Sequence, residues 1–226
     1  MSGFIQSIQE RDPACPTFFE VVFSYPGFHA IGFHKVSHFL WGLKLKGLAR
    51  FWAHIGRFLT GIEIHPGANI GKHLFIDHGM GVVIGETTVI GEDVTLYHGV
   101  TLGGKGGDTA GSKRHPTLDD GSVIGSGAQV LGDVEIGKRA KVGANSVVTS
   151  DVPPGCTVVG NPARLIHCKE SDQGKAYGMP RQLVDPVSEV IDGLLKDVKT
   201  LKEKAGVKEQ DISEEEYSKH WKGSGI

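Results

Sequence analysis

The fold of this chain is decided by a stretch with a six-residue rhythm, which reads SVIGSGAQVLGDVEIGKRAKVGANSVV from Ser122 to Val148. Its every sixth residue is aliphatic, namely Ile124, Val130, Ile136, Val142 and Val148. Glycine often follows the aliphatic residue, and the position four residues after it is usually small or β-branched. A hexapeptide repeat of this kind is the sequence sign of a parallel β-helix, in which each repeat supplies one short strand and a turn. One repeat cannot bury its own apolar face, so neighbouring repeats must stack.

The rhythm extends upstream and is broken twice. Earlier aliphatic residues at this spacing are Ile64, Ile70, Ile76, Ile84, Ile90, Leu96 and Leu102. Two extra residues enter between Ile76 and Ile84, and a polar, glycine-rich stretch separates Leu102 from Ile124. Insertions in repeat folds map to loops, often on the binding face. We therefore expect the chemistry at these two breaks.

The bulk composition favours one domain with short appendages. The chain has 226 residues, of which 33 are glycine, and a formal net charge of -2, so nothing indicates a bulk nucleic-acid binder. Cys15, Cys156 and Cys168 are scattered, so neither a disulfide framework nor a metal spacing follows, and a reducing cytoplasm is the expected location. No apolar run approaches the ~20 residues that span a bilayer. The N-terminus lacks a basic-then-apolar signal segment.

We predict a mainly β protein with three regions. Residues 1–60 form a helical segment, with one helix around residues 28–41 and a second around residues 48–59. Residues 61–166 form the β-helix, with an extended loop at about 103–122. Residues 167–226 form an amphipathic helix, with Pro186 in its first turn, and then a polar tail of a kind that is usually disordered. That helix either packs on its own chain or forms a short coiled coil between subunits.

His78 is the strongest catalytic candidate because it lies at the first break in the rhythm. Histidine is the usual general base, and such a base typically contributes about 10²–10⁴-fold to a rate. The base needs a second group to fix its tautomer. Glu63 lies fifteen residues earlier, close to one turn of a three-sided coil, so we expect it on the coil below, near His78. The simpler alternatives are a turn histidine and a solvated carboxylate.

Arg114-His115-Pro116 ends the glycine-rich loop and is the candidate for binding a carboxylate. Arginine suits this because its guanidinium can contact both carboxylate oxygens. His115 can add a second donor. The alternative is a charged loop tip without a role. The glycine cluster lacks the lysine spacing of a phosphate-binding P-loop, which we discount.

Several motifs together resemble the serine O-acetyltransferases, hexapeptide-repeat acyltransferases of the cysteine pathway. They are Gly61–Pro66, Phe75–Gly79, Val82–Thr87, Gly99–Gly104 and Lys113–Pro116. Residues 11–14 and 27–30 match as well, so the resemblance runs from about residue 10 to 166. The repeat alone indicates an acyltransferase-like β-helix. The combination of Asp77-His78, the glycine-rich loop and Arg114-His115-Pro116 is far more specific.

The resemblance implies a left-handed β-helix, a homotrimer and acetyl-CoA as co-substrate in the groove between adjacent prisms, with no metal. His78 would take the proton from the hydroxyl of L-serine, which attacks the thioester directly, and Glu63 would orient His78. The implied binding residues are Asp12 and Asp77 for the ammonium group, Arg114 and His115 for the carboxylate, and Gly103, Gly104, Ser126 and Lys141 for the CoA channel.

Two features depart from the family pattern. The usual partner of the catalytic histidine is Asp, and here it is Glu63. The helical segment is shorter than in long members, where the extra part joins two trimers, so we expect a trimer. The ending Gly225-Ile226 resembles a C-terminus that in this family inserts into the active site of O-acetylserine sulfhydrylase, which is therefore an expected partner.

Two other functions stay open from the sequence. One is a hexapeptide acetyltransferase acting on a sugar or amine, although Asp12 and Arg114 favour an acceptor with both an ammonium group and a carboxylate. The other is a scaffold or a zinc-binding β-helix related to carbonic anhydrases. The histidines that keep this second alternative open are His65, His73, His78 and His98.

Overall fold

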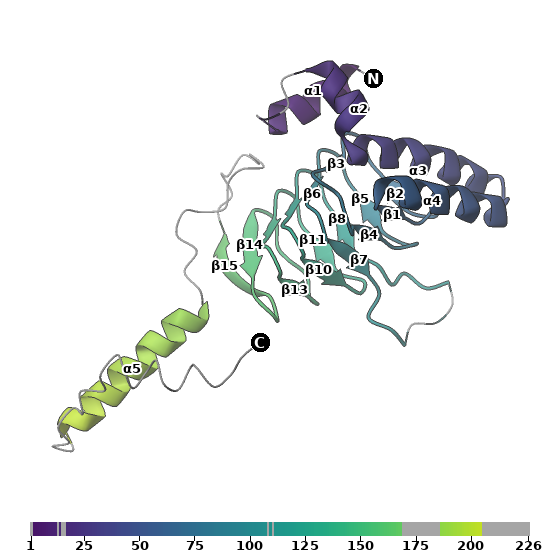
Figure 1. Cartoon of the computed structure of the whole chain (residues 1–226). Helices are drawn as coiled ribbons and strands as arrows, with labels where there is room; N and C mark the ends of the chain where they lie inside the picture. Colours follow the sequence, from purple (N-terminus) through teal and green to yellow (C-terminus); the bar gives the residue numbers. More distant parts are fainter. Residues whose placement is uncertain are drawn as a thin grey trace, which may run out of the picture. The chain divides into compact units, whose positions relative to one another are not determined.

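The computed structural model describes residues 2–12, 14, 17–107, 109, 111–168 and 186–204. It divides into two units, Met1–Leu183 and Val184–Ile226, which we describe separately. The first unit is a left-handed β-helix preceded by helices (Figure 1). The predicted fold class is therefore confirmed.

The helices that precede the strands are α1 (Ser2–Arg11), α2 (Phe18–Ser24), α3 (Pro26–Gly42) and α4 (Lys46–Thr60). A capping box starts α2, because the Thr17 hydroxyl accepts the Glu20 N–H and the Glu20 carboxylate accepts the Thr17 N–H. Pro26 at the first position suits the start of α3. At the end of α4, Gly61 takes a φ of 71°, which turns the chain into the first strand. The two predicted helices are present, each slightly longer than expected.

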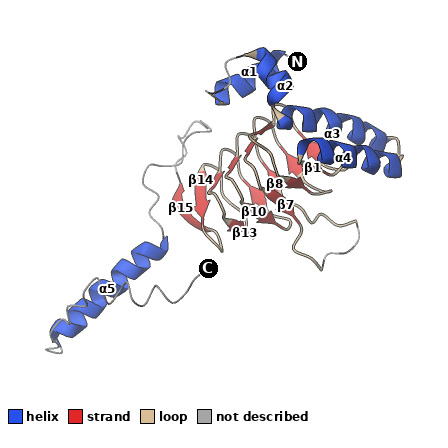
Figure 2. Cartoon of the chain, viewed as in Figure 1, coloured by secondary structure: helices blue, strands red, loops and turns tan. Residues whose placement is uncertain are grey.

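The described residues include fifteen short strands in three sheets, which are the walls of a prism (Figure 2). The first sheet holds β1 (Glu63–Ile64), β4 (Val83–Ile84), β7 (Thr101–Gly103), β10 (Gln129–Leu131) and β13 (Val147–Val148). The second holds β2 (Asn69–Ile70), β5 (Val89–Ile90), β8 (Thr117–Leu118) and β11 (Glu135–Ile136). The third holds β3 (Phe75–Ile76), β6 (Thr95–Leu96), β9 (Val123–Ile124), β12 (Lys141–Val142), β14 (Cys156–Val159) and β15 (Arg164–Cys168).

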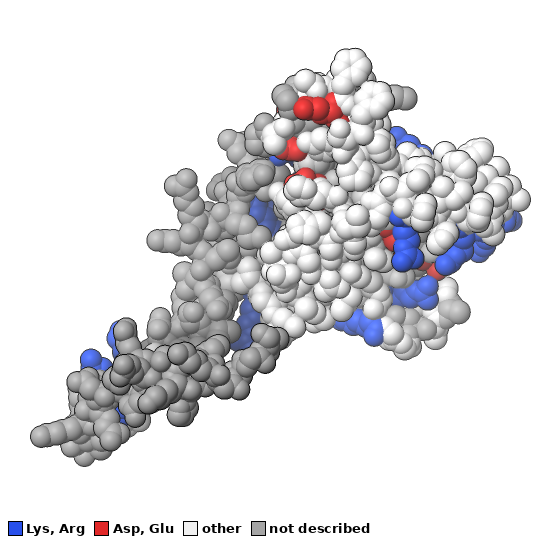
Figure 3. Space-filling model, in the orientation of Figure 1, with Lys and Arg blue, Asp and Glu red and all other residues white. Residues whose placement is uncertain are grey.

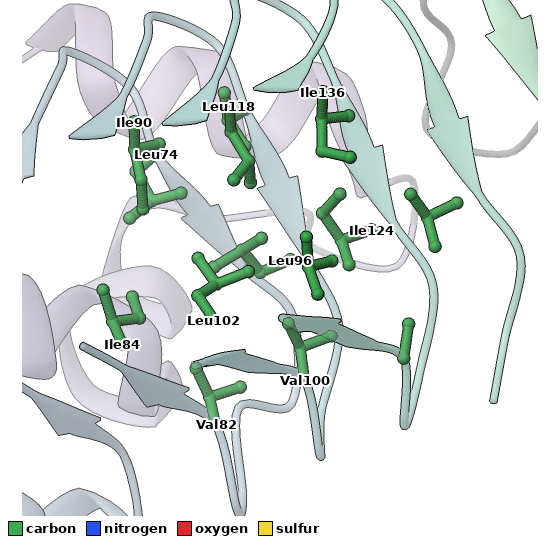
Figure 4. Packing of buried hydrophobic residues seen from close by; sticks show 14 of the residues in the cluster. Leu74, Val82, Ile84, Ile90, Leu96, Val100, Leu102, Leu118, Ile124 and Ile136 are labelled. Atoms are coloured by element: carbon green, nitrogen blue, oxygen red, sulfur yellow. The ribbon is translucent and has the colours of Figure 1, made fainter. Parts of the chain in front are cut away.

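The six-residue rhythm becomes three aliphatic columns inside the prism (Figure 4). Successive aliphatic residues move from wall to wall, and the parallel register stacks each on its counterpart one coil away. On the third wall the column is Ile76, Leu96, Ile124, Val142 and Val158, all at most 5% exposed. The apolar core is thus one narrow stack that runs the length of the coil.

The second break is shorter than predicted, because β8 already begins at Thr117. Leu118 on β8 fills the column between Ile90 and Ile136, so the coil resumes before residue 122. The end of the coil also differs from the expectation, since β15 folds back antiparallel on β14. Register places Cys156 opposite Cys168, and the two form a disulfide. No disulfide was predicted from the three scattered cysteines, and this pairing corrects that prediction.

The second unit contains α5 (Pro186–Lys204), with Pro186 at its start as predicted. Among its described side chains, four large apolar ones are exposed, namely Leu194, Leu195, Val198 and Leu201. Among the described residues, no helix is long and apolar enough to cross a membrane. The sulfhydrylase-binding ending proposed at Ile226 lies outside the described residues.

Candidate active site

The first break projects His78 from the edge between the third and first walls. β3 ends at Ile76, and the chain then takes positive φ angles at His78 (58°), Gly79 (74°) and Gly81 (77°) before β4. A positive φ is uncommon for a non-glycine residue, but it recurs in the turns of this coil, where His73, Asp93 and Arg139 also adopt it. The His78 side chain is 75% exposed, so its ring is open to a ligand.

Asp77 lies close to this imidazole, and Asp12 lies close enough to Asp77 for its charge to act on that carboxyl group. The Asp77 Oδ1 atom is 3.8 Å from His78 Nε2. Burial raises the pKa of Asp77 from 3.8, the positive charge of His78 opposes that rise, and the negative charge of Asp12 adds to it. Asp12 accepts hydrogen bonds from the Tyr25 hydroxyl and the Ala14 N–H. The structure therefore brings together Asp12, Asp77 and His78, three of the predicted residues.

His98 joins this group, although from the sequence it was considered only as one of the histidines of a possible zinc site. Its ring lies edge-on to the His78 ring, with centroids 5.8 Å apart. The two meet because the chain turns the same corner one coil higher, where Gly99 donates to the Met80 carbonyl. Their separation of twenty residues, one coil plus the two inserted ones, is the signal that could have found this contact.

Glu63 lies on β1 of the first wall, in register with Val83. Its carboxylate pairs with Arg57 of α4 at 3.0 Å. Both line a cleft of about 500 Å³ between α4 and the first wall, together with Met80, two residues after His78. No contact between the described side chains joins Glu63 to His78, so the predicted dyad stays a prediction.

Arg114 and His115 lie on another edge of the prism, between the first and second walls. The Arg114 guanidinium donates to the Glu86 carboxylate at 3.0 Å. His115 is only 8% exposed, and its ring packs against Gly85, where an added Cβ would lie 2.0 Å from the ring. His115 therefore supports the loop from inside, and Arg114, whose side chain is 36% exposed, is the member open to solvent.

One chain thus carries two halves of the predicted site on two different edges. Asp77 and His78 follow β3 and Asp12 follows α1, whereas Arg114 and His115 lie beside the turn after β4. No contact within the described part of the chain connects the halves. Figure 3 shows acidic side chains near the N-terminal helices at the top and basic ones gathered at the lower right.

The residues predicted for CoA spread over several coils. Gly103 ends β7, beside Leu131 of β10, and the exposed Gly104 opens the loop. Ser126 occupies the corner one coil above His98, as Gly127 donates to the His98 carbonyl. Lys141 begins β12 on the third wall and is buried. Gly103, Gly104 and Ser126 thus border the first wall, and Lys141 does not.

The histidines considered for zinc do not gather into a metal site. Within the described ranges, no group of three or more His, Cys, Asp or Glu side chains is arranged to hold a metal ion. His65 contacts Arg50 at 3.1 Å and the edge of Trp41, and burial lowers its pKa. His73 pairs with Asp93 at 3.2 Å.

Comparison with known proteins gives a consistent result. Residues 115–150 match the family described as bacterial transferase hexapeptide (six repeats). A serine acetyltransferase of Mycobacterium tuberculosis is 48% identical over 206 residues, covering 91% of this chain and 88% of that protein.

Two solved structures are also similar. Neisseria gonorrhoeae serine acetyltransferase in complex with serine has a TM-score of 0.68 at 45% identity, covering 72% of this chain and 66% of that one. Soybean serine acetyltransferase complexed with serine has a TM-score of 0.69 at 48% identity, covering 72% and 66%. This chain spans about two thirds of these solved chains. By its coil, its motifs and these identities, the chain belongs to the serine acetyltransferase family.

Proposed function

We propose that this chain transfers the acetyl group of acetyl-CoA to the hydroxyl of L-serine, giving O-acetylserine and CoA for cysteine biosynthesis. The observation that carries this is the division of charge between the two edges. Asp12 and Asp77 suit an ammonium group beside His78, and Arg114 suits a carboxylate. A small zwitterion with a hydroxyl group has a partner for the acidic pair, for His78 and for Arg114, whereas a neutral sugar has no charged group for the acids or for Arg114. Serine is bound in the two structures of relatives named above.

In the mechanism we propose, His78 is the general base. Its imidazole takes the proton from the serine hydroxyl as the oxygen attacks the thioester carbonyl. The tetrahedral intermediate then collapses and breaks the carbon–sulfur bond. The CoA thiolate leaves and takes the proton from the imidazolium, so the enzyme returns to its starting state. No acyl-enzyme is required.

Glu63 is the proposed orienting carboxylate for His78. Its exposed side chain reaches into the cleft that Met80 also lines, which supports this role. Since Glu63 already pairs with Arg57, the interaction with His78 requires a rotation of the Glu63 side chain or its sharing between the two partners. Asp77 offers a second carboxylate at 3.8 Å from the ring.

The proposed working form is a homotrimer with a site at each junction between prisms. The support is that His78 and Arg114 lie on different edges of one prism, so the His78 edge of one chain can face the Arg114 edge of its neighbour. Acetyl-CoA would lie in the groove between them, along Gly103, Gly104 and Ser126, with Lys141 contributing from the neighbouring wall. Arg114 binds the serine carboxylate, with His115 behind it.

Two further proposals concern the cell. Insertion of Ile226 into O-acetylserine sulfhydrylase would join consecutive enzymes of one pathway, and deletion of Ile226 should abolish binding to that enzyme. A cytoplasmic location follows from the proposed pathway. The Cys156–Cys168 disulfide is unusual for that location, because disulfides are rare in the cytoplasm. Counting free thiols on protein purified under anaerobic conditions would show whether the two cysteines are oxidised or reduced in the cell.

The decisive experiment is a thiol-release assay with acetyl-CoA and a panel of amino acids, amines and sugars. We expect CoA release with L-serine and little with the other acceptors. His78→Ala should lower kcat by about 10²-fold or more while acetyl-CoA still binds. Release with a sugar and not with serine would overturn the proposed acceptor, and full activity of His78→Ala would remove the proposed base.

A further inference from the structure

Thr87 makes an unusual concentration of contacts with the end of the glycine-rich loop. It lies in the turn between β4 and β5. Five hydrogen bonds join its hydroxyl, N–H and carbonyl groups to residues 113–115. The Thr87 hydroxyl lies 3.0 Å from the Arg114 N–H nitrogen, 3.1 Å from that of His115 and 2.9 Å from His115 Nδ1. The loop that carries Arg114 is thus fastened to this one residue.

The hydrogen-bonding capacity of the hydroxyl fits these three partners. A threonine hydroxyl has two acceptor lone pairs and one donor hydrogen. The two backbone N–H groups of Arg114 and His115 can only donate, so they take the lone pairs. The hydroxyl hydrogen is then directed to His115 Nδ1.

The tautomer of His115 follows from the backbone. The Thr87 N–H also points at His115 Nδ1, at 3.2 Å, and a backbone N–H can only donate. His115 Nδ1 must therefore carry a lone pair, and the ring proton is on Nε2. Valine at position 87 could still donate its backbone N–H to this nitrogen, but it would leave the N–H groups of Arg114 and His115 without their acceptor.

Neighbouring groups reinforce the same attachment. The Lys113 ammonium group donates to the Thr87 carbonyl at 2.7 Å, and Glu86 holds the Arg114 guanidinium at 3.0 Å. Gly85 lets the buried His115 ring lie directly on the backbone. Residues 85–87 thus form a platform on which residues 113–115 rest.

We propose that Thr87 is the positioning residue of the carboxylate subsite, holding the backbone of Arg114 and His115 so that the guanidinium faces the acceptor. This inference rests on the proposed function, in which Arg114 binds the serine carboxylate. Thr87 itself does not contact the substrate. It acts through Arg114, so its loss changes acceptor binding and leaves acetyl-CoA binding intact.

The test compares three variants of the full-length protein. Thr87→Val removes the hydroxyl with little change of shape, and Thr87→Ser keeps it. Thr88→Val is the matched control, because the neighbouring Thr88 is fully buried and its hydroxyl has no hydrogen-bond partner among the described residues. We expect Thr87→Val to raise the KM for serine at least about tenfold, with the KM for acetyl-CoA unchanged. Thr87→Ser and Thr88→Val should stay within about threefold of wild type.

A second variant and a second readout keep the test independent of any one substitution. Gly85→Ala should push on the His115 ring and reproduce the serine KM effect without touching Thr87. Trypsin reads the loop directly, since cleavage after Lys113 or Arg114 should be faster in Thr87→Val than in Thr88→Val at equal Tm. If Thr87→Val does not fold, Thr87→Ala takes its place in both measurements.

The outcomes separate this inference from the proposed function. Wild-type protein without serine-dependent CoA release overturns the function, while the trypsin comparison still tests the attachment of the loop. An active wild type with an unchanged serine KM in Thr87→Val overturns the positioning role. An equal rise of both KM values, or a fall in kcat that Thr87→Ser does not rescue, also overturns it, because it would indicate general damage.

Discussion

Replacing Glu63 with Gln separates two roles for this carboxylate. In the structure Glu63 pairs with Arg57 at 3.0 Å, and the two side chains are 45% and 57% exposed. An ion pair this exposed to solvent contributes at most about 1 kcal/mol. Glu63→Gln and Arg57→Met should therefore each lower the Tm by no more than about 2–4 °C.

Glu63→Gln and Arg57→Met should differ sharply in their effects on kcat. In its proposed role as the orienting group of His78, the Glu63 carboxylate would stabilise the imidazolium that forms when serine is deprotonated. Its loss should lower kcat by about 10²-fold, within the usual contribution of a general base. Arg57→Met is the matched control, since it breaks the same ion pair and leaves the carboxylate in place. Its kcat should stay within about threefold of wild type.

The assay is CoA release at saturating serine and acetyl-CoA, with Tm measured on the same preparations. Glu63→Asp should keep more activity than Glu63→Gln, because it retains the charge. Equal and small losses of kcat in Glu63→Gln and Arg57→Met would refute the reasoning. Glu63 would then be only the partner of Arg57, and Asp77 would be left as the carboxylate of His78.

Three further changes test the charges and the core. Asp77→Asn should raise the Tm at pH 7, because burial raises the pKa of Asp77 and the ionised carboxylate therefore costs stability at a pH above that pKa. This gain in Tm should fade below pH 4, and serine binding should weaken at pH 7. A lower Tm of the variant at pH 7 would contradict the effect of burial. Burial lowers the pKa of His34 from 6.5 to about 4, so the neutral ring costs no stability above pH 6.5, and the free energy of unfolding falls by about 3 kcal/mol as the pH drops to about 4. Urea unfolding at pH 7 and pH 4.5 should show a smaller loss of unfolding free energy for His34→Gln than for wild type, and equal losses in the two proteins would argue against this. Ile124→Ala should cost about 2–5 kcal/mol in the same unfolding assay, since Ile124 is fully buried in the third-wall column, and a cost under 1 kcal/mol would contradict the packing described here.

The coil could be predicted from sequence because its signal is local and repeated. Each aliphatic residue at the sixth position must point into the prism, and residues one coil apart must stack in one of three columns, so one register satisfies the whole pattern. The loop boundary was placed too late, because Leu118, although it lies six residues before Ile124 and so continues the rhythm, directly follows a long polar stretch. The β14–β15 hairpin was missed because it is antiparallel and follows a different pairing rule.

The sequence predicted which residues belong to the candidate site better than it predicted which of their side chains contact one another. The break in the rhythm identified Asp77 and His78, and coil stacking then brings His98 beside them. The pairing of Glu63 with Arg57 and the burial of His115 depend on side-chain directions that spacing alone does not give. Thr87 was part of a recognised motif, but its role depends on which backbone groups of a distant loop face it.

The central claim is that each active site takes His78 from one chain and Arg114 from its neighbour. Mixing His78→Ala and Arg114→Ala chains, after unfolding and joint refolding, tests it most directly at low serine concentration. Each variant alone should be nearly inactive, whereas a 1:1 mixture refolded together should regain about a quarter of wild-type activity, since about a quarter of all junctions then combine both intact residues. Mixed trimers with no more activity than the separate variants would contradict the shared site.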